Sequence, residues 1–306
     1  MKLFTASTAA TLLAITATAH PVKRQAAVTD ADILQYALTL EHLENTFYKG
    51  AVSSMSEADF LKAGFSSAYY NNLLYITHDE EQHVELLTSA LMTAGAKPVA
   101  ACTYDFPYTD PKSFVTLASV LEGVGVSAYL GAAGLINSTA YLGVAGSILV
   151  TESLHTSVQR FNLNEIAPAN PYGTALGLNP VYTLAAAFIT ACPSTNVALP
   201  VMAFPTLTAT QGIPAAPGIS FTFSVKGSLP STFFVVFVSG LSTTSVVPSM
   251  QGDMIAAVIP ATAMGQTYVF LSKSSTNTTL ADSMILYGPA IIEVTPPAPT
   301  FDLSEH

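Results

Sequence analysis

The chain has 306 residues, half of them hydrophobic and only 10% charged, and its formal net charge is −10. Phosphate backbones bind clustered Lys and Arg side chains, so this acidic composition argues against nucleic acid as a partner. The length suffices for one or two domains with their own cores, while the high hydrophobic content makes a membrane span an alternative to test.

The first 24 residues have the pattern of a signal peptide followed by a pro-segment. Lys2 supplies the positive charge, residues 8–15 are mostly apolar, and Ala17-Thr18-Ala19 offers small residues for cleavage. Lys23-Arg24 is a plausible second processing point. We therefore expect a secreted protein that is extracellular or associated with the cell wall.

Covalent modification is expected at two kinds of position. Cys102 and Cys192 are the two cysteines, and in a secreted chain an even number favours a disulfide, with two buried free thiols as the alternative. The sequons at Asn137 and Asn277 predict N-glycosylation, and Asn277 is the better candidate because it lies in a polar loop.

Helical periodicity predicts four long helices and a shorter fifth in the first two thirds of the chain. The expected ranges are 29–48, 66–94, 112–136, 140–161 and 181–191. Residues 123–151 carry no charge and are long enough to cross a membrane. Polar residues at Asn137–Thr139 and six glycines favour two bundle helices joined by a turn, so we expect no transmembrane span.

From Pro200 onward, short apolar or alternating runs are separated by Gly, Pro, Ser and Asn. This spacing predicts an all-β sandwich of the immunoglobulin or fibronectin kind. The expected organisation is therefore α + β in separate domains. A helical bundle occupies residues 25–198, a β-sandwich that we consider for contact with cell-wall polymers occupies 199–296, and a flexible tail occupies 297–306.

The motif Glu-x-x-His occurs twice, at residues 80–83 and 152–155, and each copy follows a lone glutamate on the helix before it. Each lone glutamate has a tyrosine seven residues on. Since helical residues at i, i+3, i+4 and i+7 share a face, these side chains are expected on inward-facing stripes that are otherwise apolar, apart from Gln159 at one end. The candidate metal ligands are Glu41, Glu80, His83, Glu122, Glu152 and His155.

The scarcity of basic residues indicates metal ions in this interior. Each buried carboxylate costs several kcal/mol unless it is paired, and ten basic residues, three of them expected to be removed, are too few to neutralise them; on the fourth helix only Arg160 lies near. Carboxylates and imidazoles on four helices suit two iron ions, with manganese as an alternative and zinc allowed. The plain alternative is that both Glu-x-x-His pairs are hydrogen-bonded core groups without metal.

Four neighbouring residues have open roles. Glu44 shares a face with Glu41 and is either a ligand or a hydrogen-bond acceptor beside the ligands, although the matching offsets to Tyr48 and Tyr129 favour Glu41. The two tyrosines either donate to carboxylates across the bundle or serve as core aromatics. Asp79 either orients a metal-bound histidine of a neighbouring helix or is a solvated surface acid.

Over residues 30–193 the chain resembles the ferritin-like domain of the secreted fungal and plant desiccation-related stress proteins. The segments that carry the resemblance are ALTLEHLENTFYKG, HDEEQHVELL, VLEGVGVSAYLGAA, ILVTESLHTSVQRFN and TLAAAFITACP. The resemblance implies a four-helix bundle with a short fifth helix, a β-rich tail, and a dinuclear carboxylate site formed by the six candidate ligands.

The reaction is less well defined than the fold. The leading hypothesis is a di-iron protein that reacts with O2 or peroxide in stress protection, as an oxidase, a peroxidase or a relative of manganese catalase. The alternatives are metal binding without turnover and a structural protein of the cell surface or cell wall. The sequence therefore leaves open whether the protein is an enzyme.

Overall fold

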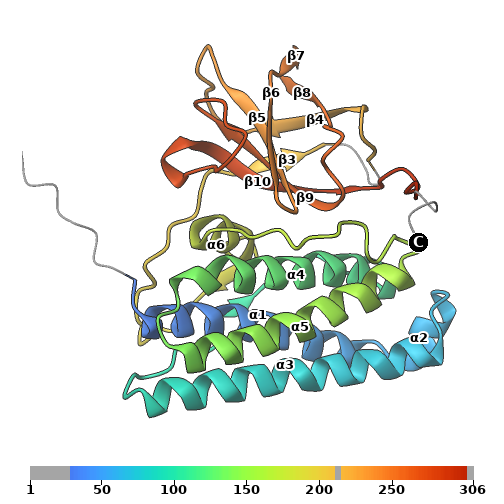
Figure 1. Ribbon diagram of the computed structural model, residues 1–306. Helices are drawn as coiled ribbons and strands as arrows, with labels where there is room; N and C mark the ends of the chain where they lie inside the picture. The colour runs from blue at the N-terminus through green and yellow to red at the C-terminus, as the bar shows by residue number, and fades with distance from the viewer. Residues whose placement is uncertain (1–27, 211–214, 302–306) are drawn as a thin grey trace, which may run out of the picture.

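The computed structural model describes residues 28–210 and 215–301, in which a layer of helices lies beside a β-rich part (Figure 1). The helices are α1 (Asp30–Ser54), α2 (Glu57–Lys62), α3 (Ser67–Thr93), α4 (Pro111–Ala132), the 3-10 turn η1 (Ala133–Leu135), α5 (Thr139–Asn162) and α6 (Leu178–Ala186). The expected signal peptide and pro-segment, residues 1–24, and residues 302–306 of the expected tail lie outside the described residues.

Side-chain caps set where several of these helices begin. Thr29 and Asp32 form a capping box at α1, Ser56 and Asp59 form another at α2, and Asp110 caps α4. Their oxygens accept from N–H groups that would otherwise lack partners in the first helical turn. α2 is absent from the expected elements although Ser-x-x-Asp is a start signal, and α1 continues past residue 48, its expected end.

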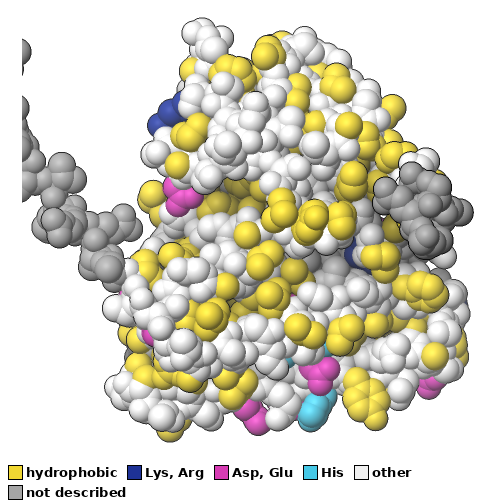
Figure 2. Space-filling view, in the orientation of Figure 1, with side chains coloured by type: hydrophobic (Ala, Val, Ile, Leu, Met, Phe, Trp, Pro, Cys, Tyr) yellow, Lys and Arg dark blue, Asp and Glu magenta, His cyan; other side chains and the backbone are white. Residues whose placement is uncertain are grey.

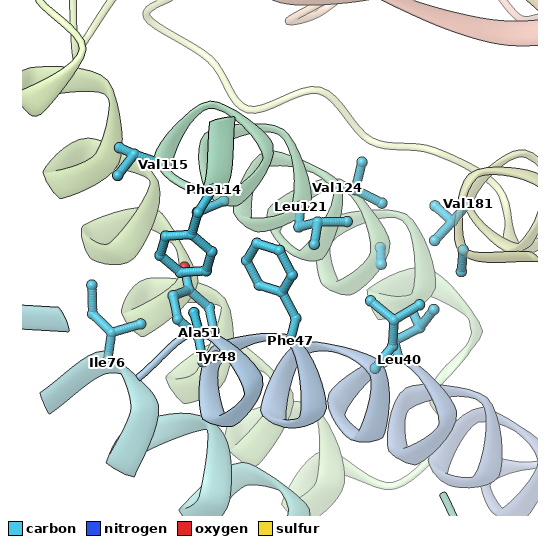
Figure 3. Close-up of a cluster of buried hydrophobic side chains, with 14 of the residues drawn as sticks. Leu40, Phe47, Tyr48, Ala51, Ile76, Phe114, Val115, Leu121, Val124 and Val181 are labelled. Carbon is cyan, nitrogen blue, oxygen red and sulfur yellow. The ribbon is translucent and has the colours of Figure 1, made fainter. Parts of the chain in front are cut away.

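An aromatic cluster fills one end of the bundle between α1, α2, α3 and α4. Phe47 stacks on Phe114 with ring centroids 4.7 Å apart, and Tyr48 meets Phe114 edge-on at 5.7 Å (Figure 3). Phe60 of α2 lies against Phe114 and against Tyr69 of α3. Aromatic side chains bury large apolar areas, so this cluster holds the helices together close to the glutamates of α1 and α4.

α4 is a core helix of the bundle. Residues 111–135 have the length and hydropathy of a membrane span, but 67% of the most apolar stretch within them is buried inside the protein. The described residues contain no other helix with these properties. α4 packs on α1, α5 and α6, and the uncharged run in the sequence divides between α4 and α5 at the expected turn.

The fifth helix is shorter than expected. α6 ends at Ala186 rather than residue 191, and β2 (Ile189–Ala191) pairs antiparallel with β1 (Thr103–Tyr104). Two adjacent β-branched residues in β2 favour the strand. The expected disulfide between Cys102 and Cys192 is present beside this pair of strands, and it ties the α3–α4 connection to the segment after α6.

The β-rich part consists of two four-stranded antiparallel sheets that share a core. One sheet has the order β10-β9-β5-β6 and the other β3-β4-β8-β7. The strands are β3 (Leu207–Ala209), β4 (Ser220–Val225), β5 (Phe234–Ser239), β6 (Ser242–Val246), β7 (Ser249–Gln251), β8 (Met254–Val258), β9 (Gly265–Ser272) and β10 (Ile285–Val294), with the 3-10 turn η2 (Asp282–Met284) before β10. Phe223 of β4 and Phe237 of β5 meet between the sheets, with ring centroids 6.5 Å apart.

One sheet also packs directly on the helices. In β9, Val269 and Leu271 belong to the core between the sheets, whereas Tyr268 and Phe270 belong to the core of the bundle. The Tyr268 hydroxyl donates to the Gly123 carbonyl of α4 at 2.9 Å. The two parts therefore share a core and are less separate than the domains expected from the sequence. Figure 2 shows a furrow along the seam and few charged side chains on this face.

A buried ion pair crosses the seam. Arg160 near the end of α5 donates to both carboxylate oxygens of Glu293 in β10, at 2.6 and 2.7 Å, and to the Ile166 carbonyl at 2.9 Å. Both charged side chains are buried. Arg160, the basic residue on the same helix as Glu152 and His155, therefore pairs across the seam and not with the bundle glutamates.

Glu293→Gln is expected to lower the free energy of unfolding by about 3 kcal/mol, because it removes the carboxylate that hydrogen-bonds to the buried guanidinium and leaves only Glu165, 3.8 Å away. Urea unfolding measures this loss. The double variant Arg160→Met with Glu293→Leu is the control and is expected to stay close to wild type, since apolar residues replace both charges. A single variant as stable as wild type would show that the pair does not hold the seam.

Candidate metal centre

The six candidate ligands converge in the interior of the bundle, where each is between 0% and 7% exposed. They form two groups, and in each group four ligand atoms lie within 4.8 Å of one another. One group is Glu41, Glu80, His83 and Glu152, and the other is Glu80, Glu122, Glu152 and His155. Glu80 and Glu152 belong to both groups, as carboxylates that bridge two ions would.

Helical periodicity produces this convergence. Ile76 and Leu87 flank the Glu-x-x-His pair on the buried face of α3, and Ile148 precedes the second pair on the buried face of α5. α3 packs against α1 and α5, and α4 packs against α1 and α5. The polar stripes of the four helices therefore face one another at one level of the bundle.

Unpaired oxygen atoms distinguish the shared glutamates from the unshared ones. Within the described residues, neither oxygen of Glu80 or of Glu152 has a hydrogen-bond partner. Glu41 and Glu122 each accept a hydrogen bond at one oxygen from a tyrosine of the facing helix. The shared carboxylates thus keep both oxygens free, as bridging ligands need, and the unshared ones direct one oxygen at a histidine.

The two tyrosines reach across the bundle to the glutamate of the other helix. Tyr48 of α1 donates to Glu122 of α4, and Tyr129 of α4 donates to Glu41 of α1. Each hydroxyl fixes one oxygen of its glutamate, which orients the other oxygen toward the interior. Both tyrosines therefore have the hydrogen-bonding role, one of the two that the sequence leaves open.

His155 approaches two carboxylates without hydrogen-bonding to them. Its Nδ1 lies 3.0 Å from Glu80 Oε1 and 3.3 Å from Glu122 Oε2, yet none of these three atoms has a hydrogen-bond partner among the described residues. Two atoms that bind one ion at about 2.1 Å and at a right angle lie about 3.0 Å apart. The spacing therefore fits atoms directed at a common ion.

His83 has the corresponding place in the other group. Its Nδ1 lies 3.4 Å from Glu152 Oε1 and 3.5 Å from Glu80 Oε2, and unlike His155 Nδ1 it is hydrogen-bonded to a carboxylate, Glu41 Oε2, at 3.2 Å. Buried carboxylates without partners are unstable unless a cation compensates them. The set of oxygen and imidazole donors is compatible with metal binding and suits iron, manganese or zinc.

Burial sets the protonation of the cluster before an ion binds. It raises the pKa of Glu41 to about 7 and also raises the pKa values of Glu44, Glu122 and Glu152. Burial alone would lower the pKa of His155, but the neighbouring Glu122 carboxylate helps to raise that pKa to about 12. At neutral pH, protons therefore compete with metal ions for these atoms.

Asp79 lies at the edge of the cluster and contacts a histidine of another helix. Its Oδ2 is 3.2 Å from His155 Nε2, on the side of the ring opposite the carboxylates, while its side chain remains 41% exposed. A carboxylate in this position fixes the tautomer and orientation of a metal-binding imidazole. Asp79 is therefore both partly exposed to solvent and in contact with the histidine. The sequence presents these two roles as alternatives.

Asp79→Asn is expected to weaken metal binding about 10-fold to 100-fold, the usual effect of losing a hydrogen-bond partner behind a metal ligand. Isothermal titration with Mn(II) measures the affinity. Glu85→Gln, an exposed change on the same helix, is the control and should leave the affinity unchanged. Equal affinities for Asp79→Asn and wild type would show that Asp79 does not contribute to metal binding.

Glu44 lies beside the two groups but belongs to neither. Glu44 and Gly125 are among the residues that line a cavity of about 20 Å³ between α1, α4 and α6. A Cβ atom at Gly125 would lie 2.3 Å from Glu152 Oε2 and 3.2 Å from Glu44 Oε1. The absence of a side chain on this glycine therefore gives the Glu152 carboxylate its place.

Two further buried residues connect to the site. Gln159 Nε2 donates to the Tyr48 hydroxyl at 3.1 Å, and the Tyr69 hydroxyl donates to Gln159 Oε1 at 2.7 Å. Gln159 is visible in the sequence as the polar end of the α5 stripe. Tyr69 lies on the same buried face of α3, seven residues before Ile76, but a buried tyrosine carries no sequence signal of its partner.

Comparison with known proteins agrees with this architecture. Residues 29–165 match the family described as Ferritin-like domain, so the helical region is ferritin-like. Protein rds1 of Schizosaccharomyces pombe is 24% identical over 258 residues, which are 81% of this chain and 61% of that protein. The chain thus spans about three fifths of the length of this relative.

A conserved hypothetical protein of Mycobacterium tuberculosis, rv2844, is similar in crystal structure with a TM-score of 0.38 and 18% identity. The match covers 44% of this chain and 91% of that one. This likeness is too distant to bear on fold or function.

Proposed function

We propose that the helical bundle binds two metal ions, preferably iron, and that the centre reacts with O2 or peroxide in stress protection. The observation that carries the proposal is the sharing of Glu80 and Glu152 between two groups, with all four of their oxygens unpaired. Bound iron would supply the electrons that such a reaction needs. The remaining four ligands divide between the ions as Glu41 with His83 and Glu122 with His155.

Glu44 would supply a proton beside the centre. Burial raises the pKa of its carboxyl group well above the usual value, which favours the protonated form. The cavity of about 20 Å³ that it lines is large enough for one water-sized molecule. A small oxidant that enters this cavity would lie beside Glu44 and Gly125.

Turnover tests the proposal directly. Iron-loaded protein is expected to oxidise Fe(II) with O2 or to consume H2O2, and both Glu80→Ala and Glu152→Ala are expected to lose this activity. Glu85→Ala on the exposed face of α3 is the control. Unchanged turnover in both site variants would reject the proposal, and peroxide turnover with manganese alone would assign manganese instead of iron.

Metal binding without turnover is the second candidate. It is favoured by the nearly complete burial of all six ligands, because a reactive centre needs a route for its oxidant. Two ions per chain with no reaction toward O2 or H2O2 would establish it.

We infer further that the β-rich part is immunoglobulin-like. The order β3-β4-β8-β7 corresponds to strands A-B-E-D of that fold, and β10-β9-β5-β6 corresponds to G-F-C with an added C′ strand. The disulfide supports secretion, since such bonds persist in oxidising compartments. Contact with cell-wall polymers and glycosylation at the two exposed sequons stay predictions.

Stabilisation by metal is expected to grow as the pH rises from 5 to 8. The folded-state pKa of Glu41 is raised from 4.5 to about 7, so its contribution to the stability of the metal-free protein is lost across that interval. The pKa values of Glu122, Glu152 and His155 are raised as well, so they act in the same direction. Thermal unfolding with and without Mn(II) measures the difference, and a metal-induced rise in Tm that shrinks with increasing pH would contradict this assignment.

A further inference from the structure

The bundle contains an apolar pocket at the end where α1 begins and α3 ends, on the left in Figure 1. Its volume is about 90 Å³ and its wall is almost entirely carbon. We call it the end pocket. Its principal lining residues are Leu34, Ala37, Leu87, Tyr129, Ala132 and Ala145.

The end pocket continues the stripes that carry the candidate ligands. Ala37 lies one helical turn before Glu41, and Leu87 lies one turn after His83, so both share the inward face of their helices. Tyr129 forms part of the wall and donates its hydroxyl proton to Glu41. A molecule in the pocket would therefore contact the ring of a residue that orients a ligand of the metal centre.

The two ends of the bundle are packed differently. Beyond the metal level on one side lies the aromatic cluster, whereas alanines from all four long helices line the end pocket. These alanines are Ala37, Ala90, Ala132 and Ala145. Protein interiors are close-packed and rarely hold voids much larger than a water molecule. A space of this size, lined by alanines together with larger apolar side chains, is suited to a second molecule.

The lining selects the chemistry of that molecule. A dry apolar cavity of about 150 Å³ in another protein binds benzene, so the end pocket, at about 90 Å³, suits a molecule no larger than benzene. Asp30 lies at the rim, where its carboxylate accepts hydrogen bonds from the backbone N–H groups of Asn137 and Ser138 at 2.8 and 2.9 Å. Its negative charge repels organic acids, so an uncharged molecule is favoured.

We propose that the end pocket binds a small uncharged apolar organic molecule against Tyr129, next to the metal centre. Binding itself requires only the four helices and the apolar wall. The further reading, that this molecule takes part in the chemistry of the centre, rests on the proposed function.

Benzene and benzoate are the probes, because they share a ring and differ in charge. In chelator-treated protein, benzene is expected to raise Tm in a saturable manner, and benzoate at the same concentration is not. Ala37→Leu and Ala145→Leu fill the pocket from two helices, and each is expected to weaken benzene binding more than about tenfold. Ala140→Leu, exposed on the same helix as Ala145, should bind as wild type does.

The proposal is overturned if benzene fails to bind saturably, if benzoate binds equally well, or if both filled variants bind like wild type. Because the assay uses metal-free protein, a chain that binds benzene but never holds metal would sustain the pocket and reject the proposed function. A chain that holds two ions but does not bind benzene would sustain the proposed function and reject the pocket. In iron-loaded protein, benzene is expected to shift the absorption of the centre through Tyr129, and an unchanged spectrum at saturation would break that link.

Discussion

Replacing Glu80 with glutamine is expected to remove both metal ions from the bundle. The carboxylate belongs to both groups of ligands, and glutamine offers one neutral oxygen where two charged ones faced the interior. The expected loss of affinity exceeds about 100-fold, the upper end of what partners behind the ligands contribute. Metal content after loading with Fe(II) and gel filtration measures the effect.

The unshared ligands provide the comparison. Glu41→Gln and Glu122→Gln each alter one group, so each is expected to leave one ion per chain under the conditions that strip Glu80→Gln of both. Glu85→Gln, on the exposed face of α3, should keep both ions. Identical metal loss in shared and unshared variants would contradict the assignment of Glu80 as a bridge.

Gly125→Ala is expected to remove metal without destabilising the metal-free protein. The added Cβ would lie 2.3 Å from Glu152 Oε2, so the carboxylate has to leave its position in both groups. Alanine is favoured over glycine inside a helix by about 1 kcal/mol, so the same substitution favours folding of the metal-free protein. Denaturation in chelator and metal analysis together separate the two effects.

Gly146→Ala is the matched control, because it makes the same change inside α5 where no atom lies within 4 Å of the new Cβ. It is expected to keep two ions and to gain up to about 1 kcal/mol of stability. A Gly125→Ala protein that still carries two ions would mean that Glu152 tolerates a different position and is not fixed by this glycine.

The inward direction of the ligands follows from their spacing within each helix. Glu80 and His83 are three residues apart, as are Glu152 and His155, and each pair lies among apolar residues, which is enough to place it on an inward face. The lone Glu41 and Glu122 are located by the same reasoning. Local sequence therefore predicts which side chains turn inward and which helices contribute them.

The spacing within one helix does not predict which side chains of different elements bond to one another. Tyr48 and Tyr129 lie on the same face as Glu41 and Glu122 of their own helices, yet each hydroxyl bonds to the glutamate of the other helix. Arg160 is a bundle residue by sequence, but it pairs with Glu293 of a strand more than a hundred residues away. Such partners depend on how the elements pack, which periodicity does not specify.

The covering of the β-rich part is a second feature of this kind. β9 alternates between two cores, because Tyr268 and Phe270 face the helices while Val269 and Leu271 face the other sheet. The sequence of such an apolar strand is compatible with a sandwich sheet that is buried on one face. It is equally compatible with a sheet that is buried on both faces. The contact with α4 is what joins the β-rich part to the bundle.

The metal content of the folded chain tests the central claim most directly. Protein purified without added chelator, and protein loaded with Fe(II) or Mn(II) and then desalted, should be analysed for metal per chain by elemental mass spectrometry. The account predicts two ions per chain in wild type and none in Glu80→Gln. A folded wild-type chain that retains no iron, manganese or zinc after loading would contradict it, because six buried acidic and imidazole groups would then be stable on their own.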